Sequence, residues 1–226
     1  MFYTKVLRPI FFKCNPEWAH DFMVFWGEVF GAFPPARWLI RLVWGYHGKD
    51  ISKIIDGVRY ERPVLLSAGF DTDGRLSRIL SSISFGGEEV GSVTARQCDG
   101  NAPPRLTRLI RNKSLVVWKG LRNHGAEVIS ERLLHKRKTK GFVVGISVAQ
   151  TNDEKVSSAD AGLEDYYKTF KIMNDKGVGD YYTINISCPN TFGGETFTTP
   201  ELLTRLLEKL STVFCVKPRY IKMPIN

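Results

Sequence analysis

The stretch Tyr182-Thr-Ile-Asn-Ile-Ser-Cys-Pro-Asn-Thr191 decides the fold of this chain. From Tyr182 onward, apolar and polar residues alternate, which is the period of a buried β-strand. The strand is predicted to end at Cys188 and Pro189, because proline has no N–H to donate to a neighbouring strand. A thiol and the amides of Asn185 and Asn190 are thereby gathered at the carboxyl end of a strand, where β/α proteins carry their sites. A strand that runs into an asparagine-rich turn, without any chemistry, would explain the same residues.

Strand and helix patterns alternate along the chain at spacings of about 30 residues, which favours a parallel sheet built from β/α units. No Gly-x-Gly-x-x-Gly follows the first strand, so a dinucleotide-binding fold is disfavoured. We therefore expect an α/β fold, a (β/α)8 TIM-type barrel that is incomplete, with about five strands present. The expected strands are 63–69, 88–94, 142–149, 182–187 and 220–224, the expected helices are 74–83, 125–137, 160–174 and 199–214, and a hairpin at 54–64 is expected to turn at Asp56-Gly57.

Residues 1–50 differ from the rest of the chain in their many aromatic residues. Asn15 and Pro16 predict the N-cap and first turn of a helix, and a second short helix is expected after Pro34-Pro35. Aromatic apolar faces with arginines opposite them are typical of helices that lie on a membrane surface. The same faces would also suit packing against a neighbouring domain. We therefore divide the chain into an N-terminal helical extension, residues 1–50, and a barrel portion, residues 51–226.

The composition restricts the function classes. Of the 226 residues, 43% are hydrophobic, which is enough for a buried core, and the formal net charge is +9. A positive balance favours anionic ligands or an anionic surface. No nucleic-acid-binding motif or zinc spacing accompanies it, so we expect neither a nucleic-acid partner nor a metal site. The dense basic run at 135–140 is predicted to be the end of a helix, where cations offset the helix dipole.

The cysteines and the hydropathy pattern predict the compartment. The four cysteines lie far apart in the sequence, which indicates a reducing environment. No apolar run reaches the length of about 18–20 residues that spans a membrane. Charged residues interrupt any secretory signal at the N-terminus. The sequence therefore predicts an intracellular, cytoplasmic protein.

The segment Asn-Ile-Ser-Cys-Pro-Asn-Thr, residues 185–191, resembles the active-site signature of dihydroorotate dehydrogenases, the FMN enzymes of pyrimidine biosynthesis. In that family the residue at the position of Cys188 is the catalytic base, serine in the quinone-linked class 2 and cysteine in the soluble class 1. Residues 15–20, Asn-Pro-Glu-Trp-Ala-His, are similar to the opening of the class 2 helical extension, which forms a quinone tunnel and rests on the membrane. The string Gly-Ser-Val-Thr-Ala-Arg-Gln at 91–97 also follows the family pattern.

The resemblance implies a reaction and a set of roles. (S)-Dihydroorotate would be oxidised to orotate, with its proton taken by Cys188, its hydride passed to FMN and the electrons then passed to quinone. The N-terminal helices would attach the protein peripherally to the inner membrane. The implied contacts are Ala68, Gly69, Ser92, Ser147, Asn185 and Lys222 with FMN, Asn185, Asn190 and Thr191 with the substrate, and His20 and Arg96 with the quinone tunnel.

Three positions depart from the family pattern, and each departure removes a polar group that would contact flavin or orotate. Thr72 stands in place of a lysine, and Val117 and Ser147 stand in place of asparagines. Lys119 or Arg122 could supply a replacement cation for the carboxylate of orotate. The alternative function is a membrane-associated homologue or fragment that has lost substrate binding. A third hypothesis is a flavin reductase that acts on a different pyrimidine or enone.

Five strands are counted from Pro63 onward, whereas a complete barrel has eight. The phosphate site of such a barrel is commonly built by the loops after strands 7 and 8. We therefore expect the chain alone to bind FMN weakly or not at all, and to be inactive unless a second polypeptide supplies the missing strands. We also expect a second polypeptide to complete the barrel at the exposed strand edge near 220–223.

Overall fold

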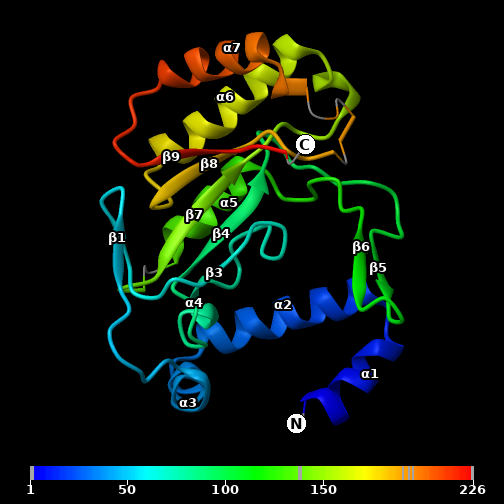
Figure 1. The fold of residues 1–226 in the computed structure, drawn as a ribbon, viewed down its shortest axis with the longest axis vertical. Coiled ribbons are helices and arrows are strands. Elements are labelled where there is room, and N and C mark those ends of the chain that lie inside the picture. The colour runs from blue at the N-terminus through cyan, green and yellow to red at the C-terminus, as the bar shows by residue number, and fades with distance from the viewer. Residues whose placement is uncertain (1–2, 137–138, 190, 193, 195, 225–226) are drawn as a thin grey trace.

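A five-stranded parallel sheet forms the centre of the protein in a computed structural model, which describes residues 3–136, 139–189, 191–192, 194 and 196–224 (Figure 1). Every strand pairs in parallel with its neighbour, and at least one helix connects each strand to the next in the sheet. The strands, in sheet order, are β3 (Leu65–Leu66), β4 (Gly87–Val93), β7 (Val143–Val148), β8 (Tyr181–Asn185) and β9 (Arg219–Lys222). This is the expected α/β fold, five strands of a barrel-type arrangement preceded by helices.

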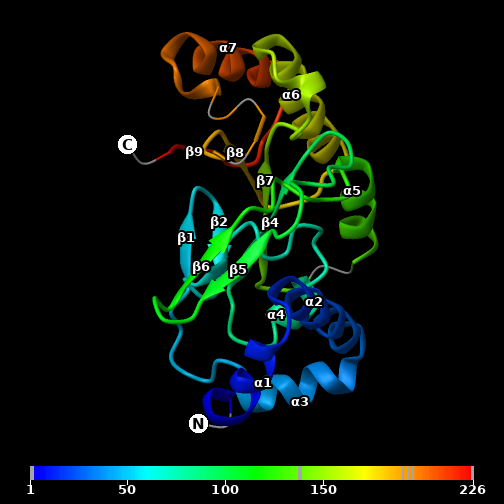
Figure 2. The same cartoon turned by 90° about the vertical axis from the view of Figure 1, so that its right-hand side faces the viewer.

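Helices pack on one face of this sheet and form the main hydrophobic core with it. The alternation read from the sequence places Tyr182, Ile184 and Ile186 on this face, and all three are buried. The ring of Tyr182 packs edge-on against Phe170, with the ring centroids 5.1 Å apart. Burying side chains of this size contributes about 1.5–3 kcal/mol each, so this strand is held firmly. The helices are α5 (Ala126–His135), α6 (Ala159–Asp175) and α7 (Pro200–Ser211), and Figure 2 shows α5 and α6 on the side of the sheet away from the hairpins.

The opposite face of the sheet carries polar groups and a hairpin. The hydroxyls of Thr183 and Tyr181 both donate to one carboxylate oxygen of Glu89, at 2.8 and 3.2 Å. The expected hairpin is formed by β1 (Lys53–Ile55) and β2 (Val58–Tyr60). Its turn is at Asp56-Gly57, where φ is 49° and 79°, a conformation that glycine adopts without strain. The hydroxyl of Tyr220 donates to Asp56 at 2.7 Å, which connects the hairpin to β9.

The helical extension contains a π-helical segment (Tyr3–Leu7) and the helices α1 (Arg8–Lys13), α2 (Pro16–Ala32) and α3 (Pro34–Trp44). Asn15 caps α2 as predicted, because its side-chain oxygen accepts the backbone N–H groups of Glu17 and Trp18 at 2.9 and 3.1 Å. Val24 of α2 packs with the short helix α4 (Ser77–Leu80) in a second hydrophobic cluster.

Most aromatic residues of the extension remain exposed, so packing on the barrel portion covers only a small part of the apolar faces. No helix among the described residues is long and apolar enough to cross a membrane. The division of the chain at residue 50 stays a prediction. The exposed aromatic residues include Trp18, Phe22, Phe25, Trp26, Phe30, Phe33, Trp38 and Trp44.

Two expected elements are shorter than the sequence pattern indicated. The strand expected at 63–69 pairs only at Leu65–Leu66, and the helix expected at 74–83 covers only Ser77–Leu80. Just before the helix, Asp71 is buried and accepts the backbone N–H groups of Arg75 and Leu76 at 2.8 and 2.5 Å, which accounts for the late start of the helix. Its carboxylate thereby holds the intervening residues in a loop, since those N–H groups are taken by a side chain instead of a helix.

The sequence did not predict a second antiparallel hairpin, formed by β5 (Leu106–Leu109) and β6 (Ser114–Val117).

The basic run at 135–140 begins where α5 ends, at His135, as predicted. Lys136, however, turns inward and donates to the carbonyls of Gly74 and Arg75, both at 2.7 Å. Among the described strands, β3 and β9 form the two edges of the sheet. A second polypeptide at the β9 edge stays a prediction.

Candidate functional site

Three neighbouring strands end with polar side chains that are joined by hydrogen bonds. The amide of Asn185, at the end of β8, donates to the hydroxyl of Ser92 on β4 at 2.8 Å. The hydroxyls of Ser92 and Ser147 lie 2.7 Å apart. All three side chains are buried. Because the carboxyl ends of parallel strands meet at one edge of a sheet, these residues, far apart in the sequence, form one continuous polar edge.

The orientation of Asn185 is fixed on several sides. Its side-chain oxygen accepts the backbone N–H and the hydroxyl of Ser187, at 3.1 and 3.0 Å. Its backbone carbonyl accepts the hydroxyl of the buried Tyr166 at 2.7 Å. Since its amide nitrogen donates to Ser92, the oxygen and nitrogen of this amide have distinct partners. Asn185 therefore presents one defined amide orientation at the polar edge.

Cys188 lies three residues beyond Asn185, in the loop after β8, and is half-buried. It lines a small cavity of about 10 Å³ together with Gln150, Tyr166 and Thr191, which is room for about one water molecule. The hydroxyl of Thr191 donates to the backbone carbonyls of Cys188 and Gly194, both at 3.2 Å. Thr191 thus stabilises the loop that carries Cys188. Asn190, the other predicted substrate contact, lies outside the described residues.

Ala68 and Gly69 follow β3 and bring backbone to the same edge. The N–H of Gly69 donates to the carbonyl of Gly91 at 2.8 Å. Gly69 has a φ of 103°, and a Cβ added there would meet no atom within 4 Å. Gly91 is crowded instead, since a Cβ there would lie 2.6 Å from the N atom of Val93 and 2.7 Å from the carbonyl oxygen of Ser147. Open space therefore faces the backbone at Gly69, whereas the backbone at Gly91 is packed within the sheet.

Lys222 lies at the end of β9, in register with Asn185. The N–H of Ile186 donates to the carbonyl of Lys222 at 3.3 Å, which extends the pairing of β8 and β9 by one residue. The side chain of Lys222 is exposed. The structure thus brings Ser92, Ser147, Asn185 and Lys222 to the carboxyl edge of the sheet, with Gly69 joined to the same edge through Gly91.

His20 connects the helical extension to the loop after β3. Its Nε2 lies 2.9 Å from the carbonyl oxygen of Phe70, and its ring packs edge-on against the Phe70 ring, with centroids 4.8 Å apart. The ammonium of Lys119 lies 3.4 Å from the same Nε2 and 3.5 Å from the carbonyl of Gly69. Burial lowers the pKa of Lys119, and the carboxylates of Asp21 and Glu17 oppose this shift.

These residues line a polar cavity of about 260 Å³ between α2 and the loops at the carboxyl edge. Its walls include His20, Thr72 and Lys119. Lys119 therefore lies in the same cavity as Thr72, the position where the family pattern has a lysine. Val117, the second departure from that pattern, is a half-exposed residue at the end of β6 and pairs with Leu106.

Arg96 lies apart from the helical extension. Its guanidinium forms an ion pair with Asp153 at 2.7 Å, and both side chains are well exposed. Its assignment to a quinone tunnel stays a prediction. Other arginines contact the extension: Arg105 pairs with Glu17 of α2 at 2.8 Å, and Arg108 donates to backbone carbonyls at the end of α1. The sequence signal that would have indicated them is a stretch, residues 100–126, that contains six lysines and arginines and no acidic residue.

A cluster of buried charges supports the loop next to Gly69. Glu88 on β4 is completely buried, and neither of its carboxyl oxygens makes a hydrogen bond among the described residues. Burial, followed by the nearby carboxylate of Asp71, raises the pKa of Glu88 to about 8. Lys136, which holds the carbonyls of the same loop, has its pKa lowered by burial.

Other cavities lie outside the polar edge, among them one of about 580 Å³ that is lined by Arg41, Tyr46 and Glu61, among others. An apolar groove of about 450 Å³ runs between α2, α3 and α4 and is lined by Phe22, Trp26, Phe30, Ile40 and Trp44, among others.

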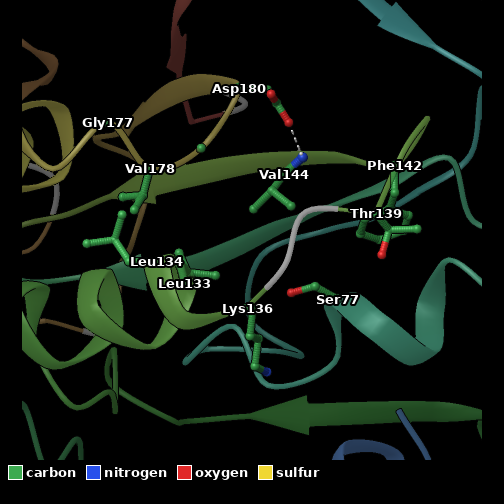
Figure 3. Close-up of a pocket in the computed structure, with 11 residues that line it drawn as sticks. Ser77, Leu133, Leu134, Lys136, Thr139, Phe142, Val144, Gly177, Val178 and Asp180 are labelled. Atoms are coloured by element: carbon green, nitrogen blue, oxygen red, sulfur yellow. Dashed lines mark hydrogen bonds between the residues drawn. The ribbon is translucent and has the colours of Figure 1, made fainter. Parts of the chain in front are cut away.

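Figure 3 shows a third cavity, of about 290 Å³, with Leu133 of α5 and Val144 of β7 in its wall. The carboxylate of Asp180 accepts the N–H of Val144 at 2.8 Å there. This cavity lies at the amino ends of β7 and β8, away from Asn185, so it is not part of the polar edge.

Comparisons with known proteins agree with the sequence motifs. A family model described as dihydroorotate dehydrogenase matches residues 51–226. The dihydroorotate dehydrogenase (quinone) of Trichormus variabilis is 33% identical over 217 residues, which cover 92% of this chain and 56% of that protein. The enzyme of the same name from Erythrobacter litoralis is 34% identical over 205 residues, covering 90% and 54%.

Solved structures give the same result. A crystal structure of ligand-free DHODH from Eimeria tenella matches with a TM-score of 0.71 and 26% identity, covering 88% of this chain and 53% of that one. A structure of DHODH from the same organism in complex with ferulenol matches with a TM-score of 0.67. The chain thus spans little more than half the length of the relatives that it matches.

Proposed function

The chain belongs to the dihydroorotate dehydrogenase family, and from that premise we propose that it carries the substrate side and the flavin-ring side of a site that oxidises (S)-dihydroorotate to orotate in pyrimidine biosynthesis. We propose quinone as the electron acceptor, by analogy with the relatives named dihydroorotate dehydrogenase (quinone). The observation that carries the proposal is the hydrogen-bonded edge formed by Ser92, Ser147 and Asn185. Asn185, the last of these residues in the chain, lies three residues before Cys188.

The residues at this edge fit the ring system of FMN. The open space at Gly69 lets a flat ring approach the backbone closely, which a side chain would prevent. Ser92, Ser147 and Asn185 offer hydroxyl and amide groups to the polar side of the ring. Lys222 adds a cation at the same edge of the sheet. When bound, FMN would supply the hydride acceptor of the reaction, while the protein supplies orientation and electrostatics.

Cys188 is the proposed base, which takes the proton from the carbon next to the ring carbonyl of dihydroorotate. A free thiol has a pKa of about 8.5, so it must be stabilised as thiolate to act at neutral pH. Lys222 lies on the neighbouring strand in register with Asn185, three residues before Cys188, and we propose it as the cation that would stabilise the thiolate.

Asn185 is the proposed orienting group for the pyrimidine ring. Its amide has one defined orientation, so a ligand that binds there meets a donor and an acceptor at fixed positions. Lys119 is the proposed cation for the substrate carboxylate, because it lies in the cavity beside Gly69 and in the same cavity as Thr72. The site would thus replace the missing lysine at position 72 with one from a different loop.

The helical extension supports the choice of quinone and of a membrane surface. The apolar groove between α2, α3 and α4 has a volume of about 450 Å³ and an almost entirely apolar lining, which suits a hydrophobic electron acceptor. The exposed aromatic faces of α2 and α3 suit the boundary between lipid headgroups and acyl chains. We therefore propose peripheral association with the cytoplasmic side of the inner membrane.

A non-catalytic homologue is the second candidate. The polar edge itself favours it, because the hydroxyls of Ser92 and Ser147 are already hydrogen-bonded to each other. These hydroxyls would have to give up that bond to contact a flavin or a substrate. Val117 also offers no polar group where the family pattern has an asparagine. In that case the chain would keep the membrane-facing helices but would neither bind orotate nor reduce a flavin.

In the deciding experiment, dihydroorotate is added anaerobically to the purified protein with FMN, and the absorbance of the flavin is measured over time. The proposed function requires bleaching of the flavin by substrate, and a second mixing with a soluble quinone should restore the colour. Cys188→Ala should slow the reduction by about 10²–10⁴-fold, the usual contribution of a general base. Cys188→Ser, which keeps a weaker acid at the same place, should retain activity only at higher pH. Wild-type protein that is saturated with FMN but not bleached would exclude catalysis by this chain alone, which both a non-catalytic homologue and an incomplete barrel predict. An Ala variant as fast as wild type would remove Cys188 from the mechanism.

A further inference from the structure

The hairpin β5–β6 and the helical extension form one rigid unit. The guanidinium of Arg108 donates to the carbonyls of Phe11 and Cys14, at 3.0 and 2.8 Å, and lies over the ring of Phe12, 5.0 Å from its centroid. The ion pair of Arg105 with Glu17 is largely buried. Figure 1 shows the hairpin above α1, and Figure 2 shows its turn at the side of the molecule, above and to the left of α1.

The hairpin exposes apolar side chains that the rest of the described structure does not cover. Ile110, in the turn, is 59% exposed, and Val116 on β6 is 50% exposed. A two-stranded hairpin is marginally stable without a covering surface, and contiguous exposed apolar side chains mark sites of interaction. The helical turns beside the hairpin also expose apolar side chains. The further exposed residues of this segment are Leu109, Leu115, Val117 and Trp118, and those of the adjoining helical turns are Val6, Ile10 and Phe12.

The charges in the hairpin and in the first helical turns are positive, and the carboxylate of Glu17 beside them is paired with Arg105. Residues 100–126 contain six lysines and arginines and no aspartate or glutamate, and residues 3–16 contain three and none. Arg111 and Lys113 lie in the hairpin turn, on either side of Asn112. Apolar side chains surrounded by cations match the boundary of an anionic lipid layer, where the apolar groups enter the acyl region and the cations meet the headgroup phosphates.

We propose that the turn of hairpin β5–β6 inserts into an anionic lipid surface, so that the membrane-docking face includes part of the barrel portion as well as the N-terminal helices. This inference rests on the proposed membrane association and extends it to residues 109–116. It also gives the contacts of Arg108 a role, because they would hold the hairpin turn and α1 at one level against the lipid.

The test uses the full chain and phosphatidylcholine vesicles with and without phosphatidylglycerol. Ile110→Asp should lower the vesicle partition coefficient about tenfold, the effect expected for withdrawing much of one large apolar side chain from lipid. The double variant Arg111→Gln/Lys113→Gln should lose about thirtyfold only with phosphatidylglycerol, because each basic residue near an anionic surface contributes about 1 kcal/mol. Val216→Asp is the matched control, since Val216 is 82% exposed in the distant loop before β9 and should leave partitioning unchanged.

Hydrogen–deuterium exchange of residues 109–114 provides a second readout that does not depend on substitutions. On phosphatidylglycerol vesicles these backbone amides should exchange more slowly than in solution. Trp38→Asp on the exposed face of α3 separates the two proposals. If it weakens binding while Ile110→Asp and Arg111→Gln/Lys113→Gln bind like wild type, the helices alone dock and the hairpin inference is wrong. A wild-type chain that does not bind phosphatidylglycerol vesicles would overturn the membrane association itself.

Discussion

Replacing Glu88 with glutamine should remove a large part of the pH dependence of stability. The carboxyl group of Glu88 is completely buried, and its pKa is raised from the ordinary value of 4.5 to about 8. Burial is the largest cause and Asp71 the second, whereas the Ser77 hydroxyl and the Lys136 ammonium offset only part of the shift. The folded protein therefore keeps this proton in a pH range where the unfolded chain has already released it.

The sign of the effect follows from proton linkage. Between about pH 4.5 and 8 the unfolded state binds fewer protons at this residue than the folded state, so the free energy of unfolding falls as the pH rises. The slope for one group is about 1.4 kcal/mol per pH unit, which amounts to a few kcal/mol over this window. The stabilising contribution is fully present below the unfolded pKa and is lost as the pH rises through the folded pKa. Glutamine has nearly the same shape and no proton to lose, so Glu88→Gln should lack this slope.

The assay is urea unfolding, followed by far-UV circular dichroism, of wild type and Glu88→Gln at several pH values from 5 to 8. The difference between the two proteins is the relevant quantity, because burial also raises the pKa of Asp165, which adds a slope of the same sign to both. Glu208→Gln removes the same charge from an exposed position and controls for net charge. A difference in unfolding free energy between wild type and Glu88→Gln that stays constant across this range would refute the reasoning.

Three further substitutions test local features. Asn15→Ala removes the cap of α2 and should destabilise the protein by about 1 kcal/mol, measured as a lower midpoint of urea unfolding. Gly91→Ala should lower Tm by more than Gly177→Ala, because both residues have positive φ but a Cβ clashes with backbone only at Gly91; equal shifts would contradict the packing at that position. Lys119→Met should weaken orotate binding to the flavin-loaded protein about tenfold, the effect expected for one charge-assisted hydrogen bond; unchanged orotate affinity in a flavin-absorbance titration would exclude Lys119 as the carboxylate partner.

Local patterns in the sequence predicted the elements whose burial alternates regularly. The strand expected at 182–187 is present at Tyr181–Asn185, so it ends before Cys188 and Pro189, and the helix after Asn15 was correct. Both could be predicted because a period of two and an N-cap are properties of consecutive residues. The family motifs predicted that Ser92, Ser147 and Asn185 belong to one site, and their side chains are joined by hydrogen bonds. The roles of these residues toward FMN and substrate stay predictions, as does the role of Cys188.

Contacts between distant segments could not be predicted in this way. The loop around Asp71 delays the start of a helix, because one buried carboxylate accepts backbone N–H groups that a helix would otherwise use. The basic run predicted that Lys136 lies at the end of a helix, yet its ammonium donates to carbonyls more than 60 residues away in the sequence. The hairpin β5–β6 has short strands and a turn without glycine, so it lacks the usual local signal.

The loop of residues 69–75 ties the helical extension to the polar edge, which determines how anchoring and catalysis can be separated by experiment. The carbonyl of Phe70 lies 2.9 Å from His20 near the start of α2, and the guanidinium of Arg75 pairs with Glu28 near its end at 2.7 Å. Gly69, in the same loop, is bonded to Gly91 at the edge of the sheet. Because α2 holds this loop at two points, removing the extension would free the backbone at Gly69 as well as the membrane-facing residues. A truncated chain that lost quinone reduction would therefore not distinguish loss of the anchor from damage to the flavin-ring side of the site. Substitutions on the exposed faces of α3 and of the hairpin turn leave the contacts of α2 in place, so they test the membrane surface alone.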